Sequence, residues 1–529
     1  MRKVFLFVVA IFIAQCAVSQ EFNNSVFKLS KVLNLISTFY VDTVNQDQLT
    51  EEAIIGMLKF LDPHSIYISK EEVEEMNEPL EGNFEGVGVQ FNILNDTIVV
   101  VSPIPGGPSE KVGIQAGDRF VTINGENVAG IGIRNNDVVE KLRGAKGTTV
   151  NVGMKRKGTK EILDFTITRD KIPIYSLDAS YMINKEVGYI KLNRFAATTM
   201  EEYYKAVENL KANGAKHLII DLQDNSGGYL NTSIDLADEF LKDQKLIVYT
   251  EGVKSPKHEY KATGRGNFEE GKVIVLVNEG SASASEILSG ALQDWDRGVV
   301  IGRRTFGKGL VQRPFNLPDG AMIRLTIARY YTPTGRLIQK SYEGGFNDYS
   351  RDLINRYNSG EFLSEDSIHF PDSLKYKTLQ NSRNVYGGGG IMPDIFIPID
   401  TSLFSQYHRD IVRKGTLNRF ILTHVDNNRK KMSENYPTFE VFKSTFMVND
   451  EMLNELVEFA KADKVVYKEE EFQKSKSLIS TQIKALIARD LWDSSEYYQI
   501  MNIENEALTK AIEVISNDSL YKKYLGFSK

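Results

Sequence analysis

The chain has 529 residues, of which 42% are hydrophobic and 25% charged, so it is too long for one compact domain and apolar enough to bury a sizeable core. Its formal net charge of −6 argues against a nucleic-acid partner. Cys16 is the only cysteine, so a chain cleaved after it has neither a disulfide nor a cysteine nucleophile.

The N-terminal segment has the pattern of a secretory signal peptide. Arg2 and Lys3 precede an apolar run at 4–14, and Ala17-Val18-Ser19 places small residues where a signal peptidase reads them. The apolar run is short for a membrane span. We predict a signal peptide at 1–19 and a secreted, periplasmic protein. Lipid anchoring at Cys16 is the less favoured alternative, because Gln15 stands where a lipoprotein signal has a small residue.

Residues 24–80 are predicted to be helical. Apolar residues recur at helical spacing between 27 and 36 and again between 54 and 58. Asp62-Pro63 ends the second helix, because proline cannot continue it. His64 follows in the turn. It could act as a ligand or a base, but we predict a structural role for it.

Residues 84–171 change to the pattern of a small β domain. Short apolar strands alternate with turns, and Asn124-Gly125 is a strong signal for a two-residue hairpin. The string GIQAGDRFVTINGENV at 113–128 resembles a PDZ domain of the bacterial protease-associated type. This resemblance implies that a peptide C-terminus binds the backbone N–H groups of Val87, Gly88 and Val89 and adds as a strand. It also implies a side-chain pocket lined by Val138 and Leu142. Alternatively, these two residues belong only to the core of the domain.

The region 175–342, continued at 385–400, alternates strands and helices. Strands are predicted at 187–192, 217–222, 246–250, 273–277 and 322–331, with helices between them. This order predicts an α/β core with mainly parallel strands, in which sites gather beyond the carboxyl ends of the strands. Asp224-Asn225-Ser226-Gly227-Gly228 and Ser283 both follow such ends, so one site could contain both.

Two further regions carry no catalytic motif. Residues 343–384 are polar without a long apolar period, and we predict a surface insertion there. Residues 401–529 are predicted to be helical, with charges of alternating sign. We assign this region to packing, to self-association as a homo-oligomer, or to contact with an adaptor.

The stretch from Val273 to Gln312 carries the chemistry. A β-branched strand ends at 277, Ser281, Ser283 and Ser285 follow at every second position, and a helical pattern begins there. Lys308 lies downstream on a glycine-flanked loop. The sequence has no HExxH motif, no paired histidines, no Walker loop and no dinucleotide fingerprint, so we predict neither a metal nor a cofactor.

A lysine can serve as a general base only when it is neutral. A free lysine is protonated at neutral pH, and lowering its pKa to near neutrality requires about 4 to 5 kcal/mol of differential desolvation. A buried loop could supply this, provided that Glu279 and Glu286 point away from Lys308. Gln312 could hold the amine without raising its pKa.

Ser283 also has a simpler interpretation. Ser283 and Glu286 have the spacing of a capping box, which is a common helix start. A helix N-terminus would also stabilise an oxyanion, because its free N–H groups and its dipole favour negative charge. One position can serve both purposes.

The string GSASASEI, followed by FGKG and a glutamine, resembles the C-terminal processing peptidases, which are Ser/Lys endopeptidases. In that family the lysine follows the serine by 25 residues, as Lys308 follows Ser283 here. The resemblance implies that Ser283 is the nucleophile, Lys308 the base and Gln312 its orienting residue. It implies oxyanion donors from Ala284 and from Gly227 or Gly228, and it makes Arg156 a weak candidate for a gating residue. The segments LDPHS at 61–65, YYTPTGRLIQ at 330–339 and GIMPD at 390–394 also match.

These observations predict a serine endopeptidase whose PDZ domain captures proteins or peptides with apolar C-termini. Two alternatives remain open. The first is a non-catalytic PDZ adaptor on a protease scaffold. The second is a Ser-His hydrolase that uses His258 as its base.

Overall fold

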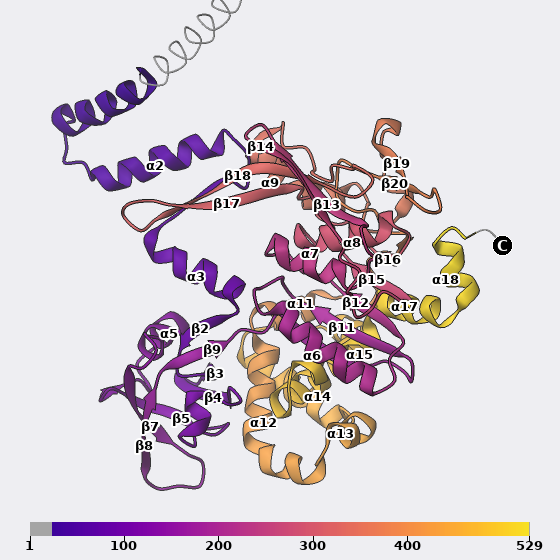
Figure 1. Ribbon diagram of the computed structural model, residues 1–529. Coiled ribbons are helices and arrows are strands. Elements are labelled where there is room, and N and C mark those ends of the chain that lie inside the picture. Colours follow the sequence, from indigo (N-terminus) through magenta and orange to yellow (C-terminus); the bar gives the residue numbers. More distant parts are fainter. Residues whose placement is uncertain (1–23, 528–529) are drawn as a thin grey trace, which may run out of the picture.

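The computed structural model describes residues 24–527, so the predicted signal peptide and Cys16 lie outside the described residues. A helix at 24–39 and α2 (Gln46–Lys59) extend from the body at the N-terminal end (Figure 1). The next strand, β1 (Ile66–Ile68), pairs antiparallel with β18 (Met322–Tyr331), and α3 (Lys70–Glu81) leads from it to the next domain. Among residues 24–527, no helix combines the length and apolarity needed to cross a bilayer.

The β domain follows and is confirmed as a separate sheet (Figure 1). Its strands are ordered β3 (Val89–Leu94), β4 (Thr97–Pro103), β5 (Arg119–Ile123), β7 (Thr149–Lys155) and β8 (Ile162–Thr168). β5 turns through Asn124-Gly125, both at positive φ, into β6 (Glu126–Asn127), as the sequence predicts. The helices α4 (Pro108–Lys111) and α5 (Asn135–Leu142) belong to the domain. A two-stranded ribbon of β2 (Asn83–Gly86) and β9 (Asp170–Pro173) connects it to the rest of the chain.

The α/β core is a six-stranded sheet. Its order is β10 (Leu177–Met182), β11 (Val187–Leu192), β12 (His217–Asp221), β15 (Val273–Val277), β16 (Val299–Gly302) and β21 (Ile395–Phe396). Only β10 runs antiparallel to its neighbour, so the predicted parallel core is confirmed. One face packs against α6 (Thr199–Ala212), α7 (Leu230–Asp238) and α8 (Ala284–Asp294). Burial on both faces explains why these strands read as continuous β-branched runs.

A second, antiparallel sheet lies beside this core. It is ordered β1, β18, β13 (Leu246–Gly252) and β14 (Ser255–Lys261), and β17 (Leu310–Asn316) also pairs with β18. The predicted insertion follows β18 and contains α9 (Gly345–Ser350), α10 (Asp352–Asn358) and a hairpin of β19 (Lys375–Lys377) and β20 (Asn384–Tyr386).

The C-terminal region consists of two structural parts. The helices α11 to α16 share a hydrophobic core of their own; their bounds are Gln406–Arg413, Thr416–Asn435, Phe439–Thr445, Asp450–Ala462, Glu469–Leu491 and Ser494–Met501. The last two helices, α17 (Glu506–Ser516) and α18 (Asp518–Tyr524), instead cover the second face of the six-stranded sheet. Residues 506–524 therefore complete the α/β core, although the alternating charges of 401–529 gave no sign of this.

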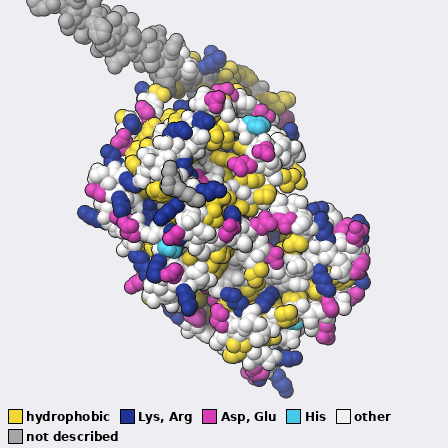
Figure 2. All heavy atoms as spheres, turned by 90° about the vertical axis from the view of Figure 1, so that its right-hand side faces the viewer, with side chains coloured by type: hydrophobic (Ala, Val, Ile, Leu, Met, Phe, Trp, Pro, Cys, Tyr) yellow, Lys and Arg dark blue, Asp and Glu magenta, His cyan; other side chains and the backbone are white. Residues whose placement is uncertain are grey.

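The surface on the side of the C-terminus carries lysine and arginine side chains interspersed with aspartate and glutamate (Figure 2). An ion pair joins the β domain to the helical part, because Arg119 in β5 lies 2.7 Å from Asp426 in α12.

Candidate active site

Two loops meet at the carboxyl edge of the parallel strands, one after β12 and one after β15. The Ser281 hydroxyl donates to the Leu222 carbonyl at 2.7 Å, and the Ser285 hydroxyl donates to the Asn225 carbonyl at 2.9 Å. The Ala282 N–H donates to the same Asn225 oxygen at 3.0 Å. The structure thus brings together the DNSGG and GSASAS segments, as their places after strand ends predict.

Ser283 differs from its two neighbouring serines. Ser281 and Ser285 are fully buried and occupied in joining the loops, whereas Ser283 is partly exposed at the start of α8. Its backbone has φ 55° and ψ −111°, a strained conformation for a residue other than glycine. Such strain persists only where surrounding contacts enforce it, and it concentrates at functional sites. Of the three hydroxyls, the structure therefore presents only that of Ser283.

Glu286 connects the Ser283 backbone to the loop of Lys308. One carboxylate oxygen accepts the N–H groups of Ser283 at 2.7 Å and Lys308 at 2.9 Å. The other accepts the Gly307 N–H at 2.7 Å and the Thr305 hydroxyl at 2.5 Å. Burial raises the pKa of Glu286, and these hydrogen bonds oppose that rise.

Tyr330 makes a second connection between the same two segments. Its buried hydroxyl lies 3.0 Å from the Ser283 carbonyl oxygen and 2.5 Å from that of Lys308. Glu286 and Tyr330 therefore each bind the main chains of both Ser283 and Lys308. Among residues 24–527, no hydrogen bond joins the two side chains in the present conformation.

The surroundings of Lys308 favour its neutral form. Burial lowers the pKa of its amine, and the positive charge of Arg324 lowers it further. The carboxylates of Glu286 and Asp62 oppose this effect. The expectation that Glu286 points away from Lys308 is therefore wrong, because its carboxylate binds the Lys308 backbone. Glu279 is held by an ion pair with Arg303 at 2.7 Å.

The two predicted oxyanion glycines follow one another in the loop beside Ser283, but their N–H groups differ in whether they already have an acceptor. A Cβ on Gly227 would come within 2.8 Å of the Ser283 Cβ, so the two residues are in van der Waals proximity. However, the Gly227 N–H already donates to the Asn225 side chain at 2.9 Å. The N–H groups of Gly228 and Ala284 have no acceptor within the described part of the chain. Of the three predicted oxyanion donors, only the N–H groups of Gly228 and Ala284 are therefore available to a substrate oxygen.

Gln312 does not contact Lys308 in this conformation. Its amide donates to the Thr326 hydroxyl at 3.3 Å, and that hydroxyl donates to Asp62 at 3.0 Å. Over residues 24–527, no hydrogen bond links Gln312 to the lysine. The predicted orienting contact would require both side chains to change conformation.

His64, for which the sequence predicts a structural role, is hydrogen-bonded to the insertion. Its Nε2 lies 2.7 Å from the hydroxyl of Tyr349. Burial and then the charge of Lys308 lower the pKa of His64 to about 4, so the imidazole is neutral near pH 7 and lies close to the lysine. The match of LDPHS to the family pattern was the signal that could have placed His64 at the site.

The insertion also reaches the site, although its polar composition gave no sign of this. The guanidinium of Arg356 is buried and donates to the carbonyls of Thr305 at 3.1 Å and Arg304 at 2.7 Å. Glu361 pairs with both Arg304 and Arg356 at 2.7 Å. These contacts hold the loop that leads into Lys308. A contact between segments some 50 residues apart has no local sequence pattern.

The alternative base is far less suitable. His258 is an exposed residue on β14, where its ring packs against Tyr260 at a centroid distance of 4.5 Å. Within the described residues, His258 has no hydrogen bond to the loop of Ser283. In the same part of the chain, no group of histidine, cysteine and acidic side chains could hold a metal ion.

The β domain keeps a place for an added strand. β3 is an edge strand paired only with β4, and the N–H groups of Val87 and Gly88 have no acceptor within residues 24–527. Val138 and Leu142 are 0% and 4% exposed, so the structure places them in the domain core and leaves a ligand almost no surface on them. Arg156 is bound within the domain by Asp118 at 2.7 Å, away from the catalytic loops.

Family models match four parts of the chain. Residues 186–347 match peptidase family S41, residues 99–156 a PDZ domain, and residues 13–72 the activating protease CtpB N-terminal domain. Residues 407–493 match a family of unknown function. The carboxy-terminal processing protease CtpB of Bacillus subtilis is 37% identical over 62% of this chain and 68% of that protein. The carboxy-terminal-processing protease of Bartonella bacilliformis is 35% identical over 64% of this chain and 80% of that protein.

The chain belongs to the carboxy-terminal processing protease family. It is therefore a serine-type peptidase with a PDZ domain. Among solved structures, the photosystem II D1 C-terminal processing protease is 31% identical, with a TM-score of 0.34 over 58% of this chain and 82% of that one. The family and fold class predicted from the sequence are confirmed. Membership of a peptidase family argues against the non-catalytic PDZ adaptor.

Proposed function

We propose that this carboxy-terminal processing protease cleaves peptide bonds with a Ser283/Lys308 dyad. The observation that carries the proposal is the Glu286 carboxylate, which binds the Ser283 and Lys308 backbones through one oxygen. The partly exposed Ser283 hydroxyl sits at the N-terminus of α8, where a helix dipole favours a developing negative charge.

The reaction begins when neutral Lys308 accepts the proton of the Ser283 hydroxyl. The serine oxygen attacks the peptide carbonyl, and the N–H groups of Gly228 and Ala284 stabilise the oxyanion. The protonated amine then gives its proton to the leaving nitrogen, and water releases the acyl group from the serine. Gln312 would orient the amine after a side-chain rotation that replaces its contact with Thr326.

The PDZ domain would supply the substrate. The open edge of β3 can pair with an extended peptide, and the N–H groups of Val87 and Gly88 can bind its terminal carboxylate. Val89 and Phe91 are only partly buried against the domain core, so apolar C-terminal residues would be preferred.

Cleavage of casein by wild type, Ser283→Ala, Lys308→Ala and His258→Ala tests the dyad. We expect the first two variants to be inactive and His258→Ala to match wild type. Activity that survives in Lys308→Ala but is lost in His258→Ala would support the Ser-His hydrolase instead. A wild type without any activity on casein or on peptides with apolar C-termini would support the adaptor.

We also propose that the protein is exported to the periplasm and that its signal peptide is cleaved after residue 19. A second proposal is that the protein associates with itself through its N-terminal helices. The segment 24–41 exposes a row of large apolar side chains, which a soluble monomer seldom leaves uncovered; they are Val26, Phe27, Leu29, Val32, Leu35, Phe39, Tyr40 and Val41. N-terminal sequencing of the periplasmic protein tests the export. Light scattering of wild type against Phe27→Ser/Phe39→Ser tests the association, and two equal monomer masses would contradict it.

A further inference from the structure

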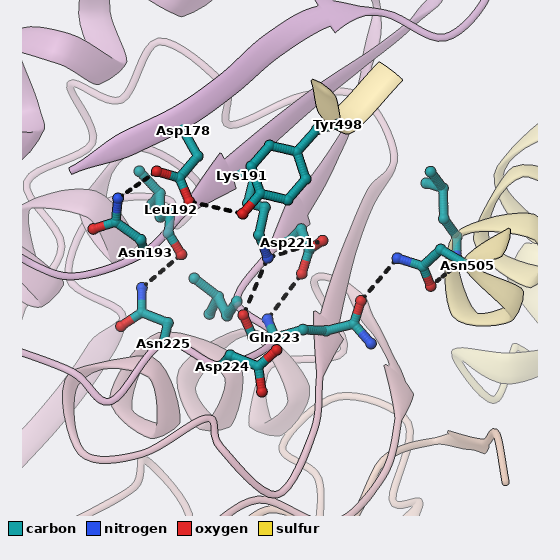
Figure 3. Close-up of polar contacts among 12 residues, drawn as sticks. Asp178, Lys191, Leu192, Asn193, Asp221, Gln223, Asp224, Asn225, Tyr498 and Asn505 are labelled. Atoms are coloured by element: carbon teal, nitrogen blue, oxygen red, sulfur yellow. Dashed lines mark hydrogen bonds and ion pairs between the residues drawn. The ribbon is translucent and has the colours of Figure 1, made fainter. Parts of the chain in front are cut away.

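A second group of polar side chains lies next to the active site, at the ends of β11 and β12 (Figure 3). Lys191 and Asp221 are 8% and 1% exposed, and the Lys191 amine lies 3.4 Å from the Asp221 carboxylate. The amine also donates to the Gln223 carbonyl at 3.1 Å, and Tyr189 donates to Asp221 at 2.6 Å. This buried pair therefore fixes the start of the loop that leads to Gly228.

The C-terminal segment contributes to the same group. The Asn505 amide, just before α17, donates to the Gln223 side-chain oxygen at 2.9 Å (Figure 3). In α16, the Tyr498 hydroxyl donates to Asp178 at 3.2 Å, and its ring lies 5.4 Å from the Lys191 amine. The loop after β12 is thus bonded to Asn505, 282 positions later in the chain, and the neighbouring strands β10 and β11 contact Tyr498.

Further hydrogen bonds hold this loop on its way to Gly228. The Gln223 N–H donates to Asp221 at 2.8 Å, and the Asn225 amide donates to the Leu192 carbonyl at 2.9 Å. Asn225 in turn holds the Gly227 N–H, one residue before the donor at Gly228. An oxyanion donor must lie about 2.7 to 3.1 Å from the developing charge, so a small shift at Gln223 has a direct consequence for catalysis.

We infer that Asn505 and Gln223 form a positioning pair through which the C-terminal segment sets the location of the Gly228 N–H. The inference rests on the proposed function, because it takes Gly228 as an oxyanion donor. Neither side chain touches the substrate. Loosening the pair weakens stabilisation of the transition state and leaves ground-state binding intact, so kcat falls and KM stays constant.

A pair of charge changes tests this contact. In Asn505→Asp, the Gln223 amide can turn over and donate to the new carboxylate; in Gln223→Glu, the new carboxylate still accepts from Asn505. Aspartate also keeps the helix cap that Asn505 provides by accepting the Leu508 N–H at 3.2 Å. Only the double variant sets two carboxylates against each other without a donor. We expect each single variant to keep kcat within about 3-fold of wild type and the double variant to lose about 10-fold or more.

The control is Gln223→Glu/Asn517→Asp. Asn517 caps α18 by accepting the Leu520 N–H at 3.1 Å and is remote from Gln223, so the total charge changes equally while the pair stays bonded. This control should match Gln223→Glu alone. A peptide aldehyde, whose hemiacetal oxygen occupies the oxyanion site, should bind the double variant more weakly in proportion to the loss of kcat.

Kinetics use a fluorogenic peptide with an apolar C-terminus, and circular dichroism follows folding. The inference is overturned if the double variant keeps the wild-type kcat, if its loss is the product of the two single losses, or if KM rises instead. A loss of kcat that accompanies unfolding also overturns it. If Ser283→Ala remained active, the proposed function would fail on its own, whatever the outcome of the double variant.

Discussion

Replacing Lys308 with methionine should abolish activity and yet stabilise the fold at neutral pH. Methionine has a similar length and no charge, so it can fill the same space. In the wild type, burial and Arg324 both disfavour the protonated amine. Within the described residues, the amine has no hydrogen-bond partner that offsets the loss of water.

The magnitude follows from this unpartnered group. A fully buried polar group without a partner costs about 1 to 3 kcal/mol, and Lys308 is only partly buried, so we expect the free energy of unfolding of Lys308→Met to exceed that of wild type by at most about that amount at pH 7. Because burial lowers the pKa of Lys308, the unfolded chain binds a proton that the folded chain lacks between the lowered pKa and the ordinary value. Wild-type stability therefore rises with pH across this window. The part of the variant's advantage that comes from the charge of the amine is complete below the lowered pKa and disappears as the pH approaches the ordinary lysine value, so the advantage shrinks with rising pH.

Guanidinium unfolding followed by circular dichroism, at pH 7 and at pH 10, measures this difference. The matched control is Lys430→Met, which changes an exposed lysine in α12 and should leave stability unchanged at both values. If Lys308→Met were less stable than wild type at pH 7 by about 1 kcal/mol or more, the reasoning would be refuted, because an unsatisfied polar group predicts a change of that size in the opposite direction. An advantage that stays constant between the two pH values would refute it equally.

Two other substitutions test how the site is held. Glu286→Gln should inactivate the enzyme and lower the free energy of unfolding, measured in urea, by about 3 to 6 kcal/mol. The NH2 group that replaces one carboxylate oxygen faces two donors, so two hydrogen bonds to a charged group are lost. An active, stable variant would contradict this. Gly228→Ala should reduce casein turnover about 100-fold or more, because its Cβ would lie 2.1 Å from the Phe195 carbonyl oxygen and its φ is +149°. Gly113→Ala, also at positive φ but with open space around the new Cβ, is the control and should remain active.

The fold and the central residues of the site could be predicted because their signals are local. The β-branched run at 273–277 is a strand buried on both faces of the sheet, and β11 and β18 have the predicted bounds. A strand end followed by small residues and a helix start places Ser283 at the edge of the sheet by chain geometry alone. The spacing to Lys308 was a family pattern, and the structure provides its physical reason in the shared carboxylate of Glu286.

Hydrogen bonding inside the loops could not be predicted in the same way. From the sequence, Gly227 and Gly228 are equivalent candidates for an N–H donor. Only the folded loop shows that the Gly227 N–H already donates to the Asn225 side chain. The sequence predicts the capping box of Ser283 and Glu286, which the structure contains, but not the contacts of Glu286 with the loop of Lys308. Its carboxylate accepts hydrogen bonds from four donors, and these offset the cost of burying its charge.

The two catalytic loops are each held by a segment that carries no catalytic motif. Arg356 from the insertion binds the loop before Lys308, and Asn505 from the C-terminal segment binds the loop before Gly228. Both contacts reach only the main chain or a neighbouring side chain, so natural variation at these positions would tune the site without changing its chemistry. Because α17 also covers the second face of the core sheet, removing the C-terminal segment would both expose apolar surface and break the hydrogen bond between Asn505 and the loop after β12. If Asn505 and Gln223 position Gly228 as inferred, this segment links stability to catalysis. The double variant Gln223→Glu/Asn505→Asp then separates the two effects, because it leaves the apolar contacts of α17 in place.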